Sequence, residues 1–173
     1  MSICFVANKD LTVLFSDIAR HLGERQEEIV WLSPSTRWTR WLEAEGVGDI
    51  VQLAGFVPDG ELRELLQRAA CVVIPSLYEP FGIVALEGMA AGAPTVVART
   101  GGLAEIVDGS GAGLLFEPGN HHQLADLVES VLADPVAAAT LPERASHLLR
   151  STYTWDAIGG ATVSVYLTTL AAD

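Results

Sequence analysis

Short apolar runs alternate with amphipathic segments along most of this 173-residue chain. The apolar runs are rich in Val and Ile, which favour strands, and the segments between them have the apolar spacing of helices of about ten residues. Strands that alternate with helices predict a parallel sheet with helices on both faces, which is a doubly wound, Rossmann-like α/β fold. The expected strands lie at 3–8, 28–33, 49–55, 71–76, 94–99 and 114–118.

Helices are expected between these strands, followed by a mostly helical remainder. Ser35 or Thr36 is the expected N-cap of the second helix and Asp59 that of the third, because short polar side chains accept hydrogen bonds from the unpaired N–H groups of a first turn. The glycine-rich segment 101–113 is expected to be a loop. The expected helices are 11–24, 35–47, 59–70, 82–92 and a region from Asn120 with breaks near Pro135 and Pro142.

Composition excludes several classes of partner. The formal net charge is -12, so the surface repels nucleic acid and anionic membranes, and a phosphorylated ligand needs donors placed locally. No apolar run approaches the ~20 residues of a membrane span, and the N-terminus lacks the basic stretch of a secretory signal. Cys4 and Cys71 each lie in an apolar run, which is typical of buried free thiols. We therefore expect a cytoplasmic chain with no integral membrane segment.

Two glutamates, Glu79 and Glu87, stand in an otherwise apolar and glycine-rich stretch. The strand at 71–76 brings the chain to the carboxyl edge of the sheet, where ligands bind in folds of this kind. Glu79 is therefore expected in the loop at that edge, and Glu87 about one and a half turns into the next helix, pointing back over the same edge. Carboxylate oxygens accept hydrogen bonds from hydroxyl groups, so this arrangement suits a polyol.

The start of the helix that carries Glu87 is a candidate anion site. The N–H groups of Phe81, Gly82 and Ile83 lie at its first turn without partners inside the helix, and the glycine allows close approach. Together with the two carboxylates, they suit a ligand that has phosphate and polyol parts. An equal alternative is that Glu79 is a solvated charge that favours the helix dipole and that Glu87 lies on a surface stripe.

The segment 75–120 closely resembles the donor-binding, C-terminal domain of retaining glycosyltransferases of the GT-B fold, family 4 or group 1, which include bacterial glycogen synthases. The resemblance rests on two glutamates separated by seven residues, on PFG between them, and on the GGLAEIV segment. LAGFVPDGELRELLQRAACVVIPS upstream and YTWDAIGGATVSVY downstream extend it to about 48–170. It implies transfer of a hexosyl group from a nucleoside-diphosphate sugar to a glycan or small acceptor, without a metal or other cofactor.

The resemblance also implies roles for individual residues. Glu79 resembles the catalytic glutamate that contacts hydroxyls of the donor sugar, and Glu87 the one that holds the ribose hydroxyls. The N–H groups at the helix start would face the donor sugar and phosphate. A second loop, at 100–102, would lie nearby; its alternative is a tight turn that needs glycine dihedral angles. The remaining implied donor-binding residues are Gly55, Phe56 and Val57, in the turn that flanks the nucleotide base, and Thr100, Gly101 and Gly102.

This chain differs from the family pattern at the cationic residues that would neutralise the charge of the diphosphate. Family members carry an arginine after the first strand of this domain and a lysine a few residues later. Lys9 is the cation at that place here, and Arg37 and Arg99 are candidate substitutes for the arginine. A complete family enzyme also has a preceding acceptor-binding domain. The chain alone is therefore expected to transfer sugar slowly or not at all, and a separate acceptor domain or a second copy is an expected partner.

Residues 1–47 have two interpretations. They can be the first two strand–helix units of the donor domain, and they also resemble the opening of an acceptor domain, which would make the chain truncated or chimeric. We divide the chain into 1–47 and 48–173 and expect the two parts to form one compact domain.

The sequence gives only weak signs of other kinds of site or function. GSGAG precedes a strand rather than following one, so dinucleotide binding is not favoured. Adjacent His121 and His122 are expected on different sides of a helix, which disfavours a metal site. Trp38 and Trp41 share one side of a helix and form either core or a surface left by a missing domain. The functional alternatives are a non-catalytic binding or assembly domain and, ranked last, a nucleotide-sugar epimerase, since no histidine is placed at the cleft.

Overall fold

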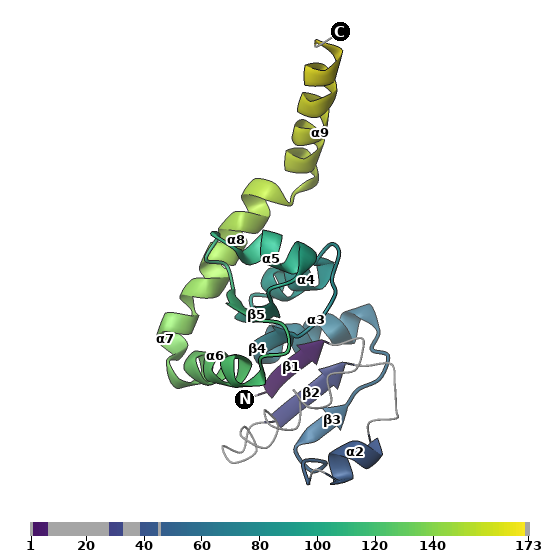
Figure 1. The fold of residues 1–173 in the computed structure, drawn as a ribbon, viewed down its shortest axis with the longest axis vertical. Helices are drawn as coiled ribbons and strands as arrows, with labels where there is room; N and C mark the ends of the chain where they lie inside the picture. Colours follow the sequence, from purple (N-terminus) through teal and green to yellow (C-terminus); the bar gives the residue numbers. More distant parts are fainter. Residues whose placement is uncertain (1, 7–27, 33–38, 45, 172–173) are drawn as a thin grey trace.

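A parallel sheet forms the centre of the computed structural model, which describes residues 2–6, 28–32, 39–44 and 46–171 (Figure 1). Its strand order, β3-β2-β1-β4-β5-β6, reverses between the neighbours β1 and β4, and every neighbouring pair is parallel. This order confirms the predicted doubly wound fold and places the ligand crevice beyond the carboxyl ends of β1 and β4. The strands are β1 (Ser2–Val6), β2 (Glu28–Leu32), β3 (Val51–Leu53), β4 (Ala69–Ile74), β5 (Thr95–Ala98) and β6 (Leu114–Phe116).

Helices cover both faces of the sheet. Consecutive β4 side chains alternate between two buried clusters: Cys71 and Val73 belong to one, and Val72 and Ile74 to the other. Burial on both faces explains why β4 is a continuous apolar run. α2 (Thr39–Ala44), α6 (His121–Ala133) and α7 (Pro135–Ala138) contribute to the first cluster; α3 (Asp59–Arg68), α4 (Ile83–Ala90), α5 (Gly101–Val107) and α8 (Thr140–Thr152) contribute to the second.

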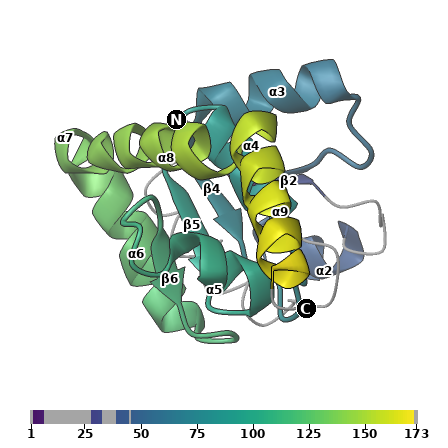
Figure 2. The same ribbon diagram turned by 90° about the horizontal axis from the view of Figure 1, so that it is seen from above.

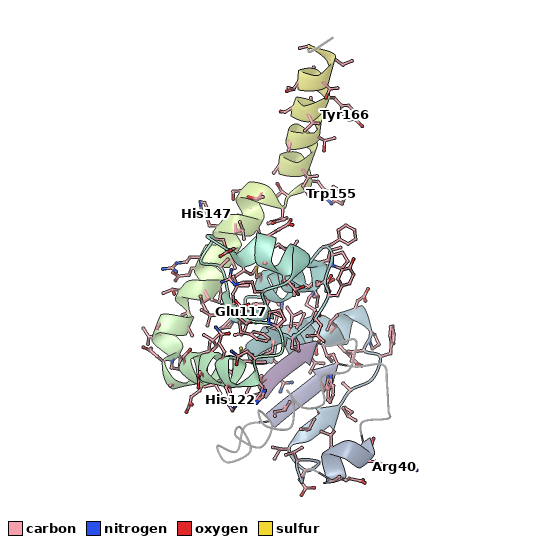
Figure 3. The ribbon with its side chains drawn as sticks, viewed as in Figure 1. Arg40, Glu117, His122, His147, Trp155 and Tyr166 are labelled. Atoms are coloured by element: carbon pink, nitrogen blue, oxygen red, sulfur yellow. The ribbon has the colours of Figure 1, made fainter. Side chains whose placement is uncertain are left out.

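The last helix, α9 (Trp155–Leu170), projects away from this body and has no buried residue (Figure 1). Figure 2 shows α8 passing alongside α4 and α9 turning away at the end of α8. Trp155 and Tyr166 point to the same side of α9 (Figure 3), and the Trp155 side chain is 87% exposed. No helix in the described part of the chain is long and apolar enough to cross a membrane.

The structure corrects three local predictions. The segment from Gly101 to Val107 is helix α5 rather than loop, because Leu103, Ile106 and Val107 recur at helical spacing and are buried. Asp59 is the first residue of α3 and not its cap; Pro58 occupies the N-cap position, and no side chain caps the helix. The chain breaks near Pro135 as expected, but Pro142 lies in the first turn of α8, where a missing N–H costs no helical hydrogen bond.

Some predictions concern residues that the structure does not describe. The helix expected at 11–24, the caps Ser35 and Thr36, and Trp38 lie outside the described residues.

Both cysteines are buried free thiols, as predicted. Burial raises the pKa of Cys4 and of Cys71 to about 12, so each thiol is held in its neutral form.

Candidate functional site

The loop between β4 and α4 lies at the carboxyl edge of the sheet and carries Glu79, as predicted. Gly82, the N-cap residue of α4, has a left-handed backbone with φ of 76°. Its N–H donates to Glu79 Oε1 at 3.3 Å. The N–H groups of Phe81 and Ile83 have no hydrogen-bond partner among the described residues. The helix start therefore keeps two donors for an anion, and Glu79 is held beside them.

The Glu79 loop is held in place by Thr100, which precedes α5, and by Gly102 in the first turn of α5. The Gly102 N–H donates to the carbonyl oxygen of Glu79 at 2.9 Å. The Thr100 hydroxyl donates to the carbonyl oxygen of Leu77 at 3.3 Å. Two loops that follow neighbouring strands are thus linked at the sheet edge, and the position of Glu79 depends on both.

Glycine is needed where these two loops meet. Gly101 has a positive φ of 44°, and a Cβ atom on it would overlap the carbonyl oxygen of Glu79. A Cβ on Gly102 would overlap the backbone of Phe81. These two glycines at the start of α5 are therefore needed for close approach to the loop that carries Glu79, and the donor-binding role of 100–102 stays a prediction.

A groove between α3 and α4 contains Glu87. Glu87 is exposed on α4, and the groove has a volume of about 440 Å³, within the range of small-molecule sites. Glu79 does not line it, so the structure gives the two glutamates different surroundings. Of the two charged groove residues on α3, Asp59 was expected only as a helix cap and Arg63 was not singled out from the sequence. The other lining residues are Leu62, Leu66, Gln67, Ala90 and Ala91.

The turn between β3 and α3 leads directly into this groove. Gly55 has a φ of 65°, the Phe56 side chain is 86% exposed, and Val57 packs partly against the core. The next helix begins at Asp59, which lines the groove. The exposed Phe56 ring precedes the groove residue Asp59 by three residues and does not itself line the groove.

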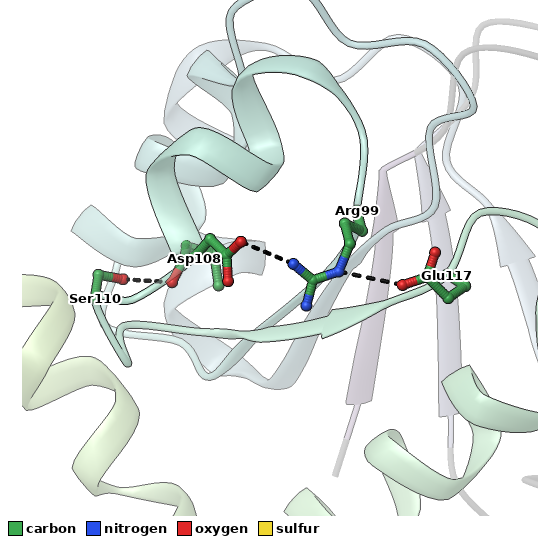
Figure 4. Close-up of polar contacts among 5 residues, drawn as sticks. Arg99, Asp108, Ser110 and Glu117 are labelled. Atoms are coloured by element: carbon green, nitrogen blue, oxygen red, sulfur yellow. Dashed lines mark hydrogen bonds and ion pairs between the residues drawn. The ribbon is translucent and has the colours of Figure 1, made fainter.

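Arg99 does not offer a free cation. Its Nη1 lies 2.9 Å from Asp108 Oδ2, and its Nε lies 3.2 Å from Glu117 Oε1 (Figure 4). A phosphate group would therefore have to compete with two carboxylates for its guanidinium. The other two candidate phosphate cations, Lys9 and Arg37, lie outside the described residues.

The histidine pair at the start of α6 differs from its prediction. The rings of His121 and His122 lie 4.2 Å apart between centroids, so they lean together rather than point to different sides. Consecutive side chains in a first turn have room to do so because no earlier turn crowds them. Within the described ranges no group of three or more His, Cys, Asp or Glu side chains could hold a metal ion.

A parallel sheet of this order agrees with what comparison with known proteins finds. The family described as "Glycosyl transferases group 1" matches residues 35–148. The chain belongs to this family. This glycosyltransferase domain is 41% identical over 137 residues to "Glycogen synthase" of Mycobacterium tuberculosis, a match that covers 79% of this chain and 32% of that protein.

Solved structures give the same fold. "Sucrose-phosphate synthase" from Thermosynechococcus elongatus matches with a TM-score of 0.74 and 26% identity, over 98% of this chain and 46% of that one. Anabaena Alr3699/HepE in complex with UDP-glucose matches with a TM-score of 0.74 and 22% identity, over 86% of this chain and 44% of that one. The glycosyltransferase chain therefore spans about a third of its curated relative and about half of the solved chains. The predicted family and fold class are confirmed.

Proposed function

We propose that this chain is the donor-binding half of a retaining glycosyltransferase that transfers a hexosyl group from a nucleoside-diphosphate sugar to a glycan or small acceptor. The α3–α4 groove lined by Glu87 carries the proposal, and the start of the same helix α4 keeps donors that are unpaired among the described residues. Family membership supports it, as does the likeness to a protein solved with UDP-glucose. We include residues 1–47 in the donor domain, since β1 and β2 pair within the same sheet as β3 to β6.

Each part of the donor has a proposed place. The N–H groups of Phe81 and Ile83 bind the diphosphate at the positive end of α4. Glu87 accepts hydrogen bonds from the two ribose hydroxyls in the groove. Glu79 accepts hydrogen bonds from hydroxyls of the donor sugar through the lone pairs that the Gly82 N–H leaves open.

Turnover by the chain alone should be slow or absent. Catalysis requires stabilisation of the charge on the departing diphosphate and an oriented acceptor. Arg99 is already engaged by two carboxylates, and the match covers only a minor part of the curated relative. A second candidate function is an assembly domain that keeps the fold without catalysis. The exposed apolar side chains of α9 favour that alternative.

Calorimetry with a nucleoside diphosphate tests the ribose role. Glu87→Ala should weaken binding at least ~10-fold, since charge-assisted hydrogen bonds contribute roughly 1.5–3 kcal/mol each and ~1.4 kcal/mol is a factor of ten. Glu143→Ala, at an exposed carboxylate in the first turn of α8, changes the net charge equally and should leave affinity within ~2-fold. Equal or tighter binding by Glu87→Ala would show that Glu87 is a solvated charge and does not hold the ribose.

Glu79 is tested with the substitution that preserves its structural contact. Glu79→Gln keeps an oxygen that can accept from the Gly82 N–H, so α4 should still start at the same residue. The variant should bind the bare nucleotide normally and the matching nucleotide-sugar more weakly, because its proposed partner is the sugar. Equal loss for both ligands would place Glu79 at the nucleotide instead.

A further inference from the structure

A small pocket lies between helix α8 and the loop that joins α5 to β6. It has a volume of about 270 Å³ and is lined by Ser110, Arg144, His147, Leu148 and Ser151, none of which lines the groove that contains Glu87. α5 begins after the carboxyl end of β5, and β6 begins at the opposite edge of the parallel sheet, so the loop between them lies toward the amino ends of the strands. The pocket is therefore separate from the proposed donor site.

The pocket is lined by cationic and polar side chains and by no carboxylate. Its four lining residues on α8 are three or four positions apart, so they lie on one face of the helix. Glu143 is next to Arg144 in the sequence but lies about 100° round the helix, because an α-helix has 3.6 residues per turn. The chain has 22 acidic residues against 10 Lys and Arg residues, yet none of the acidic residues lines this pocket. The local charge is thus opposite in sign to the net charge.

The loop between α5 and β6 positions the guanidinium of Arg144. Gly111 has a φ of 64°, and a Cβ atom on it would lie 3.0 Å from Arg144 Nη1 and 3.3 Å from Arg144 Cδ, so the arginine side chain lies against this glycine. The Ser110 hydroxyl donates to the carbonyl oxygen of Val107 at 2.8 Å (Figure 4). It also accepts from the N–H of Ala112 at 3.1 Å. These bonds fix the loop, so Arg144 is placed before a ligand binds.

Arg144 and His147 are not occupied by an acidic partner in the part of the chain that the structure describes. There, neither side chain makes an ion pair or a hydrogen bond. Asp108, the carboxylate that precedes the loop, is held instead by Arg99 at 2.9 Å. The Ser151 hydroxyl donates to the carbonyl oxygen of Leu148 at 3.2 Å. The groups open to a ligand are therefore the guanidinium and the imidazole, which projects from α8 (Figure 3).

We propose that this pocket binds a phosphate group, either as the free ion or as the monoester of a small polyol, through Arg144 and His147. The guanidinium fork donates to two phosphate oxygens, and a ring N–H of the imidazole donates to a third. Residues three apart on a helix have Cβ atoms about 5–6 Å apart, so both side chains can reach one phosphate group. The volume is below the ~300–1,000 Å³ of drug-sized sites, which suits a small anion. This site goes beyond the proposed function and does not depend on it.

Calorimetry of the intact chain with inorganic phosphate and with glycerol 3-phosphate tests the site, at one ionic strength kept constant with chloride. Arg144→Gln should weaken binding of both probes at least ~10-fold, because it removes the charge-assisted, two-oxygen contact. Arg150→Gln is the matched control, since it removes the same charge from α8 at a residue that does not line the pocket, and it should change affinity by less than ~2-fold. Tighter binding of glycerol 3-phosphate than of phosphate would identify a monoester as the ligand, and equal or weaker binding the free ion.

Gly111→Ala tests the placement of Arg144 without changing any charge. The added Cβ atom should displace the guanidinium and weaken phosphate binding at least ~3-fold. Gly109→Ala is its matched control: Gly109 also has a positive φ, of 73°, but its Cβ would meet nothing within 4 Å, so it strains the same loop without touching Arg144. Equal losses in both glycine variants would refute the placement of Arg144 by Gly111. If the folded wild-type chain binds neither probe, or if Arg144→Gln binds them as tightly as the wild type or only as weakly as Arg150→Gln, the pocket is not a phosphate site.

Discussion

Helices α4 and α9 have similar compositions and opposite surroundings. Each is largely apolar and carries a single charged residue, Glu87 in α4 and Asp156 in α9. α4 buries Ala85, Gly88 and Met89, whereas α9 buries none of its 16 residues. Apolar content alone therefore does not decide burial. α4 lies between two strands of the sheet, so it must return across a face, whereas α9 follows a helix and has no described strand after it (Figure 1).

The glycines of the two regions differ in how much space an added Cβ atom would have. A Cβ atom on Gly88 would lie 3.2 Å from Val72 Cγ1, and one on Gly102, in the first turn of α5, would overlap the backbone of Phe81. A Cβ on Gly159 or Gly160 in α9 would meet nothing within 4 Å. Gly88 and Gly102 in the body are therefore sensitive to an added methyl group, and the two glycines of α9 are not.

The largest expected effect comes from adding a methyl group where two backbones meet. Gly102→Ala should lower the free energy of unfolding by about 2–4 kcal/mol, because Phe81 backbone must move rather than a flexible side chain. Gly159→Ala is the matched control in α9. It should raise local helicity, since alanine favours helix by about 1 kcal/mol, and leave unfolding of the body unchanged. Urea unfolding of both variants measures the difference, and equal stabilities would remove the contrast between the two regions.

A smaller effect is expected from the thiol that shares the buried cluster of α4. Cys4 belongs to that cluster with Ala85 and Met89, and burial raises its pKa from 9.0 to about 12. A raised pKa means that its contribution to stability is complete below pH 9 and is lost as the pH rises from 9 to 12. Unfolding free energy should therefore fall by about 1 kcal/mol more between pH 9 and pH 10 in the wild type than in Cys4→Ala. Parallel pH profiles would mean that the thiol is not desolvated.

Most of the fold could be predicted from the sequence because local spacing determines it. A parallel strand such as β4, buried on both faces, must be a continuous apolar run, and Glu79 follows it at the sheet edge. Helix α5 was missed because its two glycines resemble loop residues. They are instead needed for close approach to the Glu79 loop, and the helical signal lies in the apolar residues after them.

The parts of the site that depend on tertiary contact could not be predicted. The groove beside Glu87 exists because α3 and α4 lie side by side, and the sequence distance between Arg63 and Glu87 gives no sign of it. The partners of Arg99 are likewise nine and eighteen residues away along the chain. They meet it only because β5 pairs with β6, so the sequence left Arg99 as a candidate for phosphate binding.

The smallest expected effect comes from the exposed ion pairs of Arg99. It tests whether an exposed contact in the body contributes as little to the free energy of unfolding as the exposed surface of α9. The Arg99 side chain is 41% exposed, and its partners Asp108 and Glu117 are more exposed still. Exposed ion pairs contribute about 0–1 kcal/mol because water and salt screen them, so Arg99→Gln should lower unfolding free energy by less than ~1 kcal/mol. Its two carboxylates also leave the guanidinium unavailable to a diphosphate, so nucleotide affinity should stay within ~2-fold. A tenfold loss of nucleoside diphosphate affinity in this variant, with stability unchanged, would show instead that Arg99 leaves Asp108 and Glu117 to bind the phosphate. The missing cation of the family would then lie at the end of β5.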